Sequence, residues 1–176
     1  MNITIRQETE KDYKVSEFIV KEAFNDAVYS DHKEHLLVAK LRNSDAFIPE
    51  LSLVAELDGE IVGHIMLTKV IIKNSEREYE SLALAPVSVL PQYQNKGVGS
   101  ALIVESLKIA KRLGFKSVIV LGHSKYYPRF GFKPASIWGI KAPFDVPDES
   151  FMALELESGS LDGVSGVVVY PKEFYE

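Results

Sequence analysis

Residues 94–100, with the sequence QNKGVGS, lie directly before an apolar segment of helical spacing and could bind an anion. The first N–H groups of a helix lack intrahelical acceptors and lie at the positive end of the helix dipole. Gly97 and Gly99 let the backbone approach a ligand closely, and Lys96 adds positive charge. Because the dipole alone contributes about 0.3 to 1 kcal/mol, the N–H geometry must supply most of the affinity. The natural occupant of such a cradle is a pyrophosphate.

A structural role or a nucleotide site would also account for the same glycine pair. Glycine at a helix start serves a tight turn or close packing of the helix on a sheet. A dinucleotide-binding loop needs a third small residue, where Leu102 stands, and an acid about 20 positions on, where the next apolar run ends in Gly122 and His123. A P-loop needs Lys-Ser or Lys-Thr after the second glycine, and neither follows. The structural role and the pyrophosphate cradle therefore stay open.

Two predicted strands and a predicted helix position this loop. The run YESLALAPVSVL (79–90) is rich in β-forming residues, residues 97–113 have helical spacing, and SVIVLG (117–122) is short, apolar and β-branched. The apolar face of the helix comprises Val98, Leu102, Ile103, Leu107, Ala110 and Leu113. A strand, a crossover helix and a buried strand predict a βαβ unit with parallel strands.

Shorter patterns predict the remaining elements. The segment TEKD resembles a capping box, in which Thr9 caps a helix through about Phe24. A second helix is expected from about Asp31, as its cap, to Arg42. Asp58-Gly59 is a strong hairpin turn signal within LSLVAELDGEIVGHIMLTKVIIK. Further expected are a strand at ITIRQ (3–7), a short helix ending at Gly131, a long loop over 137–149, and strands near FMALELE (151–157) and GVVVY (166–170).

Composition narrows the function classes. The 176 residues fit one domain, 1–176. The net charge of −5 argues against nucleic acid as a partner, and no apolar run is long enough for a membrane span. Without a basic and apolar leader at the start, the expected location is the cytoplasm. Zero cysteines exclude disulfides, cysteine-based zinc sites and a covalent cysteine intermediate, and no metal is expected.

The segment VSVLPQYQNKGVGSAL resembles the coenzyme A loop of the GNAT superfamily of N-acetyltransferases. The family signature is Gln or Arg, two residues, Gly, any residue, then Gly or Ala, which here is residues 94–99. The later YYPRFGF resembles the family element Phe-Tyr-x-x-x-Gly-Phe, and the two segments together are most similar to a bacterial subgroup of predicted acetyltransferases. The resemblance extends from ITIRQ to about Pro134. It implies an α/β (α+β) fold with a mixed central sheet, a splayed parallel strand pair and flanking helices.

The resemblance also implies roles for individual residues. Backbone groups of Val87 and Val89 would pair with the pantetheine arm of acetyl-CoA, and the amides from Gln94 to Ser100 would hold its pyrophosphate. The N–H of Val89 would stabilise the oxyanion, and Tyr127 would protonate the leaving thiolate. Tyr126, at the family's phenylalanine position, would serve packing. The expected cofactor-binding residues are Val87, Ser88, Val89, Gln94, Asn95, Lys96, Gly97, Val98, Gly99, Ser100, Ser124 and Tyr127; for Ser124, a helix cap is the alternative.

The general base and the acceptor stay open. Ala83 stands where some family members carry a glutamate, and strand parity places nearby Glu80 on the opposite face. Glu56, His64, His123 or a water chain are the alternatives. Selection of a small-molecule or peptide amine is expected from the first two helices, their connection NDAVYSD (25–31) and the loop with Trp138 and Phe144. A homodimer stays open.

These observations predict an acetyl-CoA-dependent N-acetyltransferase. Lacking cysteine, it would work through a ternary complex. An acyl-CoA-binding or sensing module with weak or no catalysis is the alternative, and a nucleotide-binding α/β protein is a third, disfavoured hypothesis.

Overall fold

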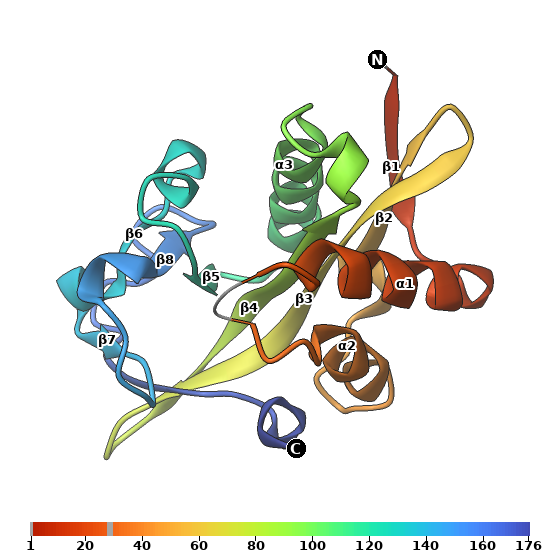
Figure 1. The fold of residues 1–176 in the computed structure, drawn as a ribbon. Helices are drawn as coiled ribbons and strands as arrows, with labels where there is room; N and C mark the ends of the chain where they lie inside the picture. Colours follow the sequence, from red (N-terminus) through yellow and green to blue (C-terminus); the bar gives the residue numbers. More distant parts are fainter. Residues whose placement is uncertain (1, 28–29) are drawn as a thin grey trace. The chain divides into compact units, whose positions relative to one another are not determined.

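The computed structural model describes residues 2–27 and 30–176, which divide into two compact units. The first unit contains the residues up to 68, 85–109 and 173–176, and the second contains 69–84 and 110–172. Strands β3 (Glu60–Lys73) and β4 (Glu78–Val89) run from one unit into the other (Figure 1). The expectation of a single domain stays a prediction.

Antiparallel strands form the sheet of the first unit. It contains β1 (Ile3–Gln7), β2 (Ser52–Leu57), the first part of β3 and the last part of β4, in the order β1-β2-β3-β4. β2 pairs antiparallel with both β1 and β3. The predicted hairpin turn is confirmed: Asp58 and Gly59 have left-handed φ angles of 53° and 82°, as a two-residue turn between twisted strands requires.

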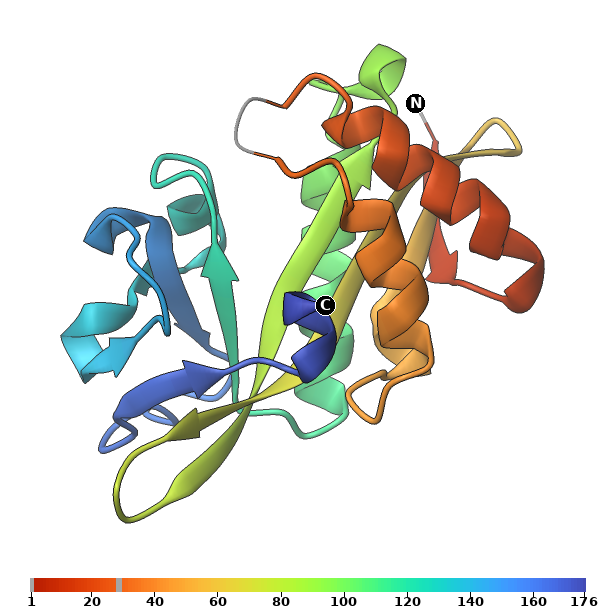
Figure 2. The same ribbon diagram turned by 60° about the horizontal axis from the view of Figure 1, so that its bottom comes forward.

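Helices cover both faces of this sheet. α1 (Tyr13–Phe24) and α2 (Glu34–Arg42) lie on one face, and α3 (Val98–Arg112) lies on the other (Figure 2). The capping box is confirmed in the 3-10 turn η1 (Glu10–Asp12), where Asp12 accepts the backbone N–H of Thr9 at 2.8 Å. The predicted start of the second helix is wrong. Asp31 accepts the N–H of Lys33 at 2.9 Å in a local turn, and the helix begins only at Glu34.

The second unit contains the parallel pair. Its strand order is β3-β4-β5-β8-β6, and β9 pairs with β3 and β7. Leu82 and Ala83 of β4 lie in parallel register with Val118 and Ile119 of β5, which confirms the βαβ unit and the mixed sheet. The strands are β5 (Ser117–Leu121), β6 (Lys133–Pro134), β7 (Ile140–Lys141), β8 (Phe151–Glu155) and β9 (Gly166–Val169), so the two late strands are also confirmed.

The predicted loop over 137–149 is wrong in part. This range contains β7, the last residues of the 3-10 helix η5 (Ala135–Trp138) and the first residues of the 3-10 helix η6 (Asp148–Ser150). β7 pairs with β9, and the N–H of Gly166 donates to the carbonyl of Gly139 at 3.1 Å. A two-residue strand paired with a distant segment has no period for the sequence to display. The remaining 3-10 helices are η2 (Pro49–Leu51), η3 (Pro91–Tyr93), η4 (Tyr127–Phe130) and η7 (Lys172–Tyr175).

Among the residues that the structure describes, no helix combines the length and apolar character needed to cross a membrane.

A buried ionic cluster ties the helices of the first unit to its strands. Arg42 of α2 donates to Glu8 at 2.7 Å and to Glu17 of α1 at 2.6 Å, and only 4% of the Arg42 side chain and 1% of the Glu8 side chain are exposed. Glu8 also accepts from Ser52 at 2.8 Å. Burial acts to raise the pKa of Glu8, but His64 and Arg42 outweigh it and hold that pKa below its ordinary value.

We expect Arg42→Met to lower the free energy of unfolding by roughly 3 to 5 kcal/mol at pH 7, because it leaves the buried Glu8 carboxylate without its cation. Urea denaturation followed by circular dichroism measures this loss. The double variant Glu8→Gln/Arg42→Met should be more stable than Arg42→Met, since only the partly exposed Glu17 carboxylate then lacks its cation and no charge remains at the buried position 8. Equal stability of the two variants would contradict an ionic role for the pair.

Stability should also depend on pH. The lowered pKa of Glu8 gives stability that is present above its unfolded pKa and is lost as the pH falls through the folded one. Burial lowers the pKa of His64 to about 4, so the unfolded chain takes up its proton first as the pH falls from about 6.5. As the pH falls, Glu8 and His64 therefore both lower the free energy of unfolding.

Candidate functional site

The loop between β4 and α3 combines two left-handed residues with a helix start, two features that the predicted anion cradle needs. Asn95 and Gly97 both have left-handed φ angles, 62° and 86°. A Cβ at Gly97 would meet nothing within 4 Å, so its φ angle and not a lack of space favours glycine there. The first helical bond runs from the N–H of Ala101 to the carbonyl of Gly97 at 3.0 Å. The N–H groups of Val98 and Gly99 therefore precede it and have no acceptor within the helix.

Gly63 of β3 sets how closely α3 approaches the sheet. A Cβ on Gly63 would lie 3.0 Å from side-chain atoms of Val98 and Leu102, and 3.2 Å from the carbonyl oxygen of Ser88. The first turn of α3 therefore packs directly on the backbone of β3, beside the end of β4. We did not predict this role from the sequence, although a glycine inside a strand signals close approach of another element.

The last residues of β4 direct their backbone groups to opposite edges. The N–H of Leu90 donates to the carbonyl of Val62 on β3 at 2.9 Å. Since successive residues of a strand alternate, the N–H and C=O groups of Val87 and Val89 face away from β3. Among the described residues, the register of β4 with β5 covers only Leu82 and Ala83. The outward groups of Val87 and Val89 therefore lie beyond this parallel register.

Two polar side chains, Gln94 and Ser88, lie near the strand end. Gln94 donates from Nε2 to the carbonyl of Val89 at 3.0 Å. Ser88 is 2% exposed, and its hydroxyl has no hydrogen-bond partner among the described residues. Its side chain lies on the buried face, opposite to those of Val87 and Val89. The cofactor role of Ser88 stays a prediction.

In the second unit, close packing fixes Tyr127. The residue is 8% exposed and packs edge to face against Tyr126 and Phe132, with ring centroids 5.1 and 5.8 Å apart. The carbonyl of His123 accepts the N–H of Tyr126 at 3.1 Å and that of Tyr127 at 3.3 Å. Burial, with a smaller effect of Tyr126, raises the pKa of Tyr127 to about 12. The phenol is therefore protonated at neutral pH.

Gly122, at the end of β5, leaves the space that the Tyr127 ring occupies. A Cβ there would lie 2.3 Å from one ring carbon of Tyr127 and 2.9 Å from the next. The φ angle of Gly122 is not left-handed, so only this contact demands glycine. The sequence marks Gly122 as the end of a strand. It contains no local pattern that indicates the contact with the Tyr127 ring.

Ser124 lies between Gly122 and Tyr127 in the chain and is half-buried. The alternative that it caps the short helix is wrong, because the N-cap of η4 is Tyr126. Its cofactor role stays a prediction. Val87, Val89 and the loop to Ser100 thus lie together in the first unit, whereas Ser124 and Tyr127 lie in the second.

The candidate bases have different surroundings. Glu56 accepts from Arg6 at 2.6 Å. His64 is fully buried and lies 3.2 Å from the Ser52 hydroxyl and 3.5 Å from Glu8, so it belongs to the buried ionic cluster. His123 and Glu80 are exposed. Ala83 is 3% exposed within the parallel pair. Among the described residues, no group of three or more His, Asp or Glu could hold a metal ion.

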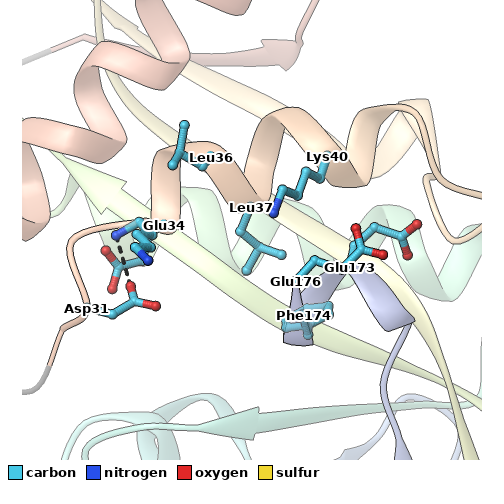
Figure 3. Close-up of a pocket in the computed structure, with 9 residues that line it drawn as sticks. Asp31, Glu34, Leu36, Leu37, Lys40, Glu173, Phe174 and Glu176 are labelled. Carbon is cyan, nitrogen blue, oxygen red and sulfur yellow. Dashed lines mark hydrogen bonds between the residues drawn. The ribbon is translucent and has the colours of Figure 1, made fainter.

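A cavity of about 360 Å³ lies between α2 and the C-terminal η7 (Figure 3). Leu36, Leu37 and Phe174 give it an apolar part, and its charged lining comprises Asp31, Lys33, Glu34, Lys40, Glu173 and Glu176. Helix α2 was expected to contribute to selectivity; the C-terminal segment was not. Residues 28 and 29 of the expected connection lie outside the described residues, and Trp138 and Phe144 belong to the second unit.

The mixed sheet with flanking helices matches the fold of similar proteins. The model of the acetyltransferase (GNAT) family matches residues 7–132, so the chain belongs to this family. The uncharacterized N-acetyltransferase YjhQ of Escherichia coli (strain K12) is 42% identical over 118 residues, 66% of this chain. The chain spans 65% of the length of that relative.

Two solved structures resemble the fold over almost the whole chain. A GNAT family acetyltransferase from Brucella melitensis in complex with acetyl-CoA is 35% identical, with a TM-score of 0.81 and 98% of each chain covered. YhbS, a GNAT family N-acetyltransferase from Escherichia coli in complex with CoA, is 25% identical, with a TM-score of 0.86. The match covers 100% of this chain and 93% of the YhbS chain. The expected fold class is confirmed.

We expect Gly122→Ala to lower the free energy of unfolding by about 1 to 3 kcal/mol, because its methyl group displaces the Tyr127 ring. Urea denaturation measures this loss. In a Tyr127→Ala background the ring is absent, and the same substitution should then cost much less. An equal cost in both backgrounds would show that the contact with Tyr127 does not set the requirement for glycine.

Proposed function

We propose that this protein transfers an acetyl group from acetyl-CoA to a primary amine by direct attack. The observation that carries this proposal is the anion cradle at the start of α3 beside the outward backbone groups of β4. Membership of the acetyltransferase (GNAT) family and the CoA and acetyl-CoA complexes of similar proteins support it.

In this proposal the backbone holds the donor. The amides from Gln94 to Ser100 bind the pyrophosphate, with Lys96 adding charge, and the outward groups of Val87 and Val89 pair with the pantetheine arm. Because the carbonyl of Val89 already accepts from Gln94, its N–H is the group left for the ligand. This N–H donates to the thioester oxygen and stabilises the oxyanion of the tetrahedral intermediate.

The chemistry has three requirements. The amine must lose a proton, because a free ammonium has a pKa near 10. The new C–N bond then forms, the C–S bond breaks, and the departing thiolate takes a proton from Tyr127. Its raised pKa keeps the proton in place until then, and the cationic nitrogen of the intermediate favours the phenolate during transfer. The cationic nitrogen gives up its extra proton to solvent, which yields the neutral amide, and solvent reprotonates the phenolate.

We assign proton removal from the amine to water, with the exposed Glu80 and His123 as the alternatives. Glu56 is held by Arg6 and His64 by the buried cluster, so neither is available as a mobile base. The zero cysteine count leaves no thiol for an acetyl-enzyme, which favours a mechanism in which both substrates bind together.

A binding module that senses acyl-CoA is the second candidate. The observation in its favour is the engagement of Glu56 and His64 in structural contacts, together with alanine at position 83. Such a module keeps the cradle and lacks efficient turnover.

Binding of the donor is tested by thermal unfolding with acetyl-CoA, CoA and NAD. At 100 times the dissociation constant, a ligand of the folded state adds about 2.7 kcal/mol to the free energy of unfolding. We expect both CoA species to raise the melting temperature and NAD to leave it unchanged. Stabilisation by NAD alone would overturn the assignment.

Turnover is tested by thiol release across a panel of amines. The panel should include cationic amines with an apolar part, because the cavity beside α2 combines carboxylates with Leu36, Leu37 and Phe174. Release that depends on an amine supports the enzyme; CoA binding without release supports the sensing module.

We expect Tyr127→Phe to lower kcat by roughly 10² to 10⁴, with acetyl-CoA affinity nearly unchanged, because it removes only the acidic hydroxyl. Tyr126→Phe is the matched control, since this residue is assigned to packing, and it should retain kcat. Steady-state thiol release and calorimetric titration measure the two quantities. An unchanged kcat for Tyr127→Phe would remove the acid role.

A further inference from the structure

The side chain of Gln94 holds the last peptide of β4 in place. The chain turns back through η3, where the N–H of Tyr93 donates to the carbonyl of Leu90 at 2.8 Å and that of Gln94 to Pro91 at 3.3 Å. This turn brings Gln94 to the carbonyl of Val89, five residues earlier, at 3.0 Å from Nε2. The loop therefore folds back onto the strand that precedes it.

The peptide between Val89 and Leu90 is bonded on both sides. Its N–H donates to Val62 on β3 at 2.9 Å, and its C=O accepts from Gln94. Without Gln94, β3 would hold only one side of this peptide, and the strand end could rotate. The N–H of Val89 belongs to the preceding peptide, so its direction follows from the backbone angles that the two bonds restrain.

An electrostatic consequence follows from strand parity. The N–H and the C=O of Val89 project toward the same edge, away from β3. An unbonded carbonyl there would place partial negative charge beside an oxyanion that the N–H is meant to stabilise. The amide of Gln94 offsets this charge and leaves the N–H as the polar group presented to a ligand.

We infer that Gln94 is a positioning residue, which acts through Val89 and not through contact with the reacting atoms. The inference rests on the proposed acetyl transfer, in which the Val89 N–H binds the thioester oxygen. It assigns to the Gln94 side chain a role separate from that of its own backbone N–H in the cradle. Because the bond is exposed, it adds little to folding, so its loss should appear in the chemical step.

Three variants test this role. Gln94→Met keeps the length of the side chain and removes the donor. Gln94→Arg restores N–H donors within reach of the Val89 carbonyl. Gln92→Met is the matched control, because Gln92 is an exposed glutamine in the same loop, outside the proposed machinery.

We expect Gln94→Met to lower kcat for thiol release about tenfold, from the loss of one orienting hydrogen bond. The dissociation constant of acetyl-CoA should stay within about twofold of the parent, Gln94→Arg should recover most of kcat, and Gln92→Met should match the parent. Unchanged kcat for Gln94→Met, or weaker acetyl-CoA binding at constant kcat, overturns the positioning role. The proposed function survives either result, because the parent still turns over.

The amide signal of Val89 in a ¹⁵N-labelled sample gives a readout that does not need turnover. We expect acetyl-CoA to shift this signal in the parent and in Gln94→Arg, and to shift it much less in Gln94→Met. Equal shifts in all three overturn the inference. A parent chain that binds no CoA overturns the proposed function together with it.

Discussion

The hydrogen bond from Leu90 to Val62 determines which atoms of the strand end can meet a ligand. It sets the parity of β4, so that the amide groups of Val87 and Val89 are turned outward. Gly63 then allows α3 to begin directly against β3, which places the helix start beside that strand end. A shift of one residue in this register would turn the amide groups of Val87 and Val89 toward β3 and present those of Ser88 and Leu90 at the outward edge instead.

The other face of the first unit carries the buried ionic cluster. Glu8, just after β1, joins Arg42 of α2 and Ser52 at the start of β2, and Arg42 also reaches Glu17 of α1. His64 lies in the same cluster, one residue beyond Gly63. The strand that carries the helix contact on one face therefore carries the ionic contact on the other. Two candidate bases, Glu56 and His64, lie in ionic contacts, with Arg6 and with Glu8 respectively, and their role as bases stays a prediction.

Local signals in the sequence were sufficient for much of the fold. The Asp58-Gly59 turn, the capping box at Thr9 and the strand, loop and helix around residues 84–112 depend on residues close together in the chain, and the structure confirms them. The errors arise where a competing local turn or a distant residue decides. The start of α2 depends on a local turn at Asp31 that competes with a cap, and β7 exists through its pairing with β9. Gly63 is required by side chains 35 or more positions further along the chain, and Gly122 by one that is five positions further along. Neither spacing forms a sequence motif.

The candidate site for the acetyl donor consists almost wholly of main-chain atoms, in a loop whose path depends on two left-handed residues, Asn95 and Gly97. Main-chain donors are common to every amino acid except proline, so their identity as chemical groups does not depend on which side chain is attached. Replacing residues of this loop one by one with alanine would leave most of the donors present. The information that specifies the ligand thus lies in backbone geometry, and a side-chain scan of the surface would underestimate the importance of this segment.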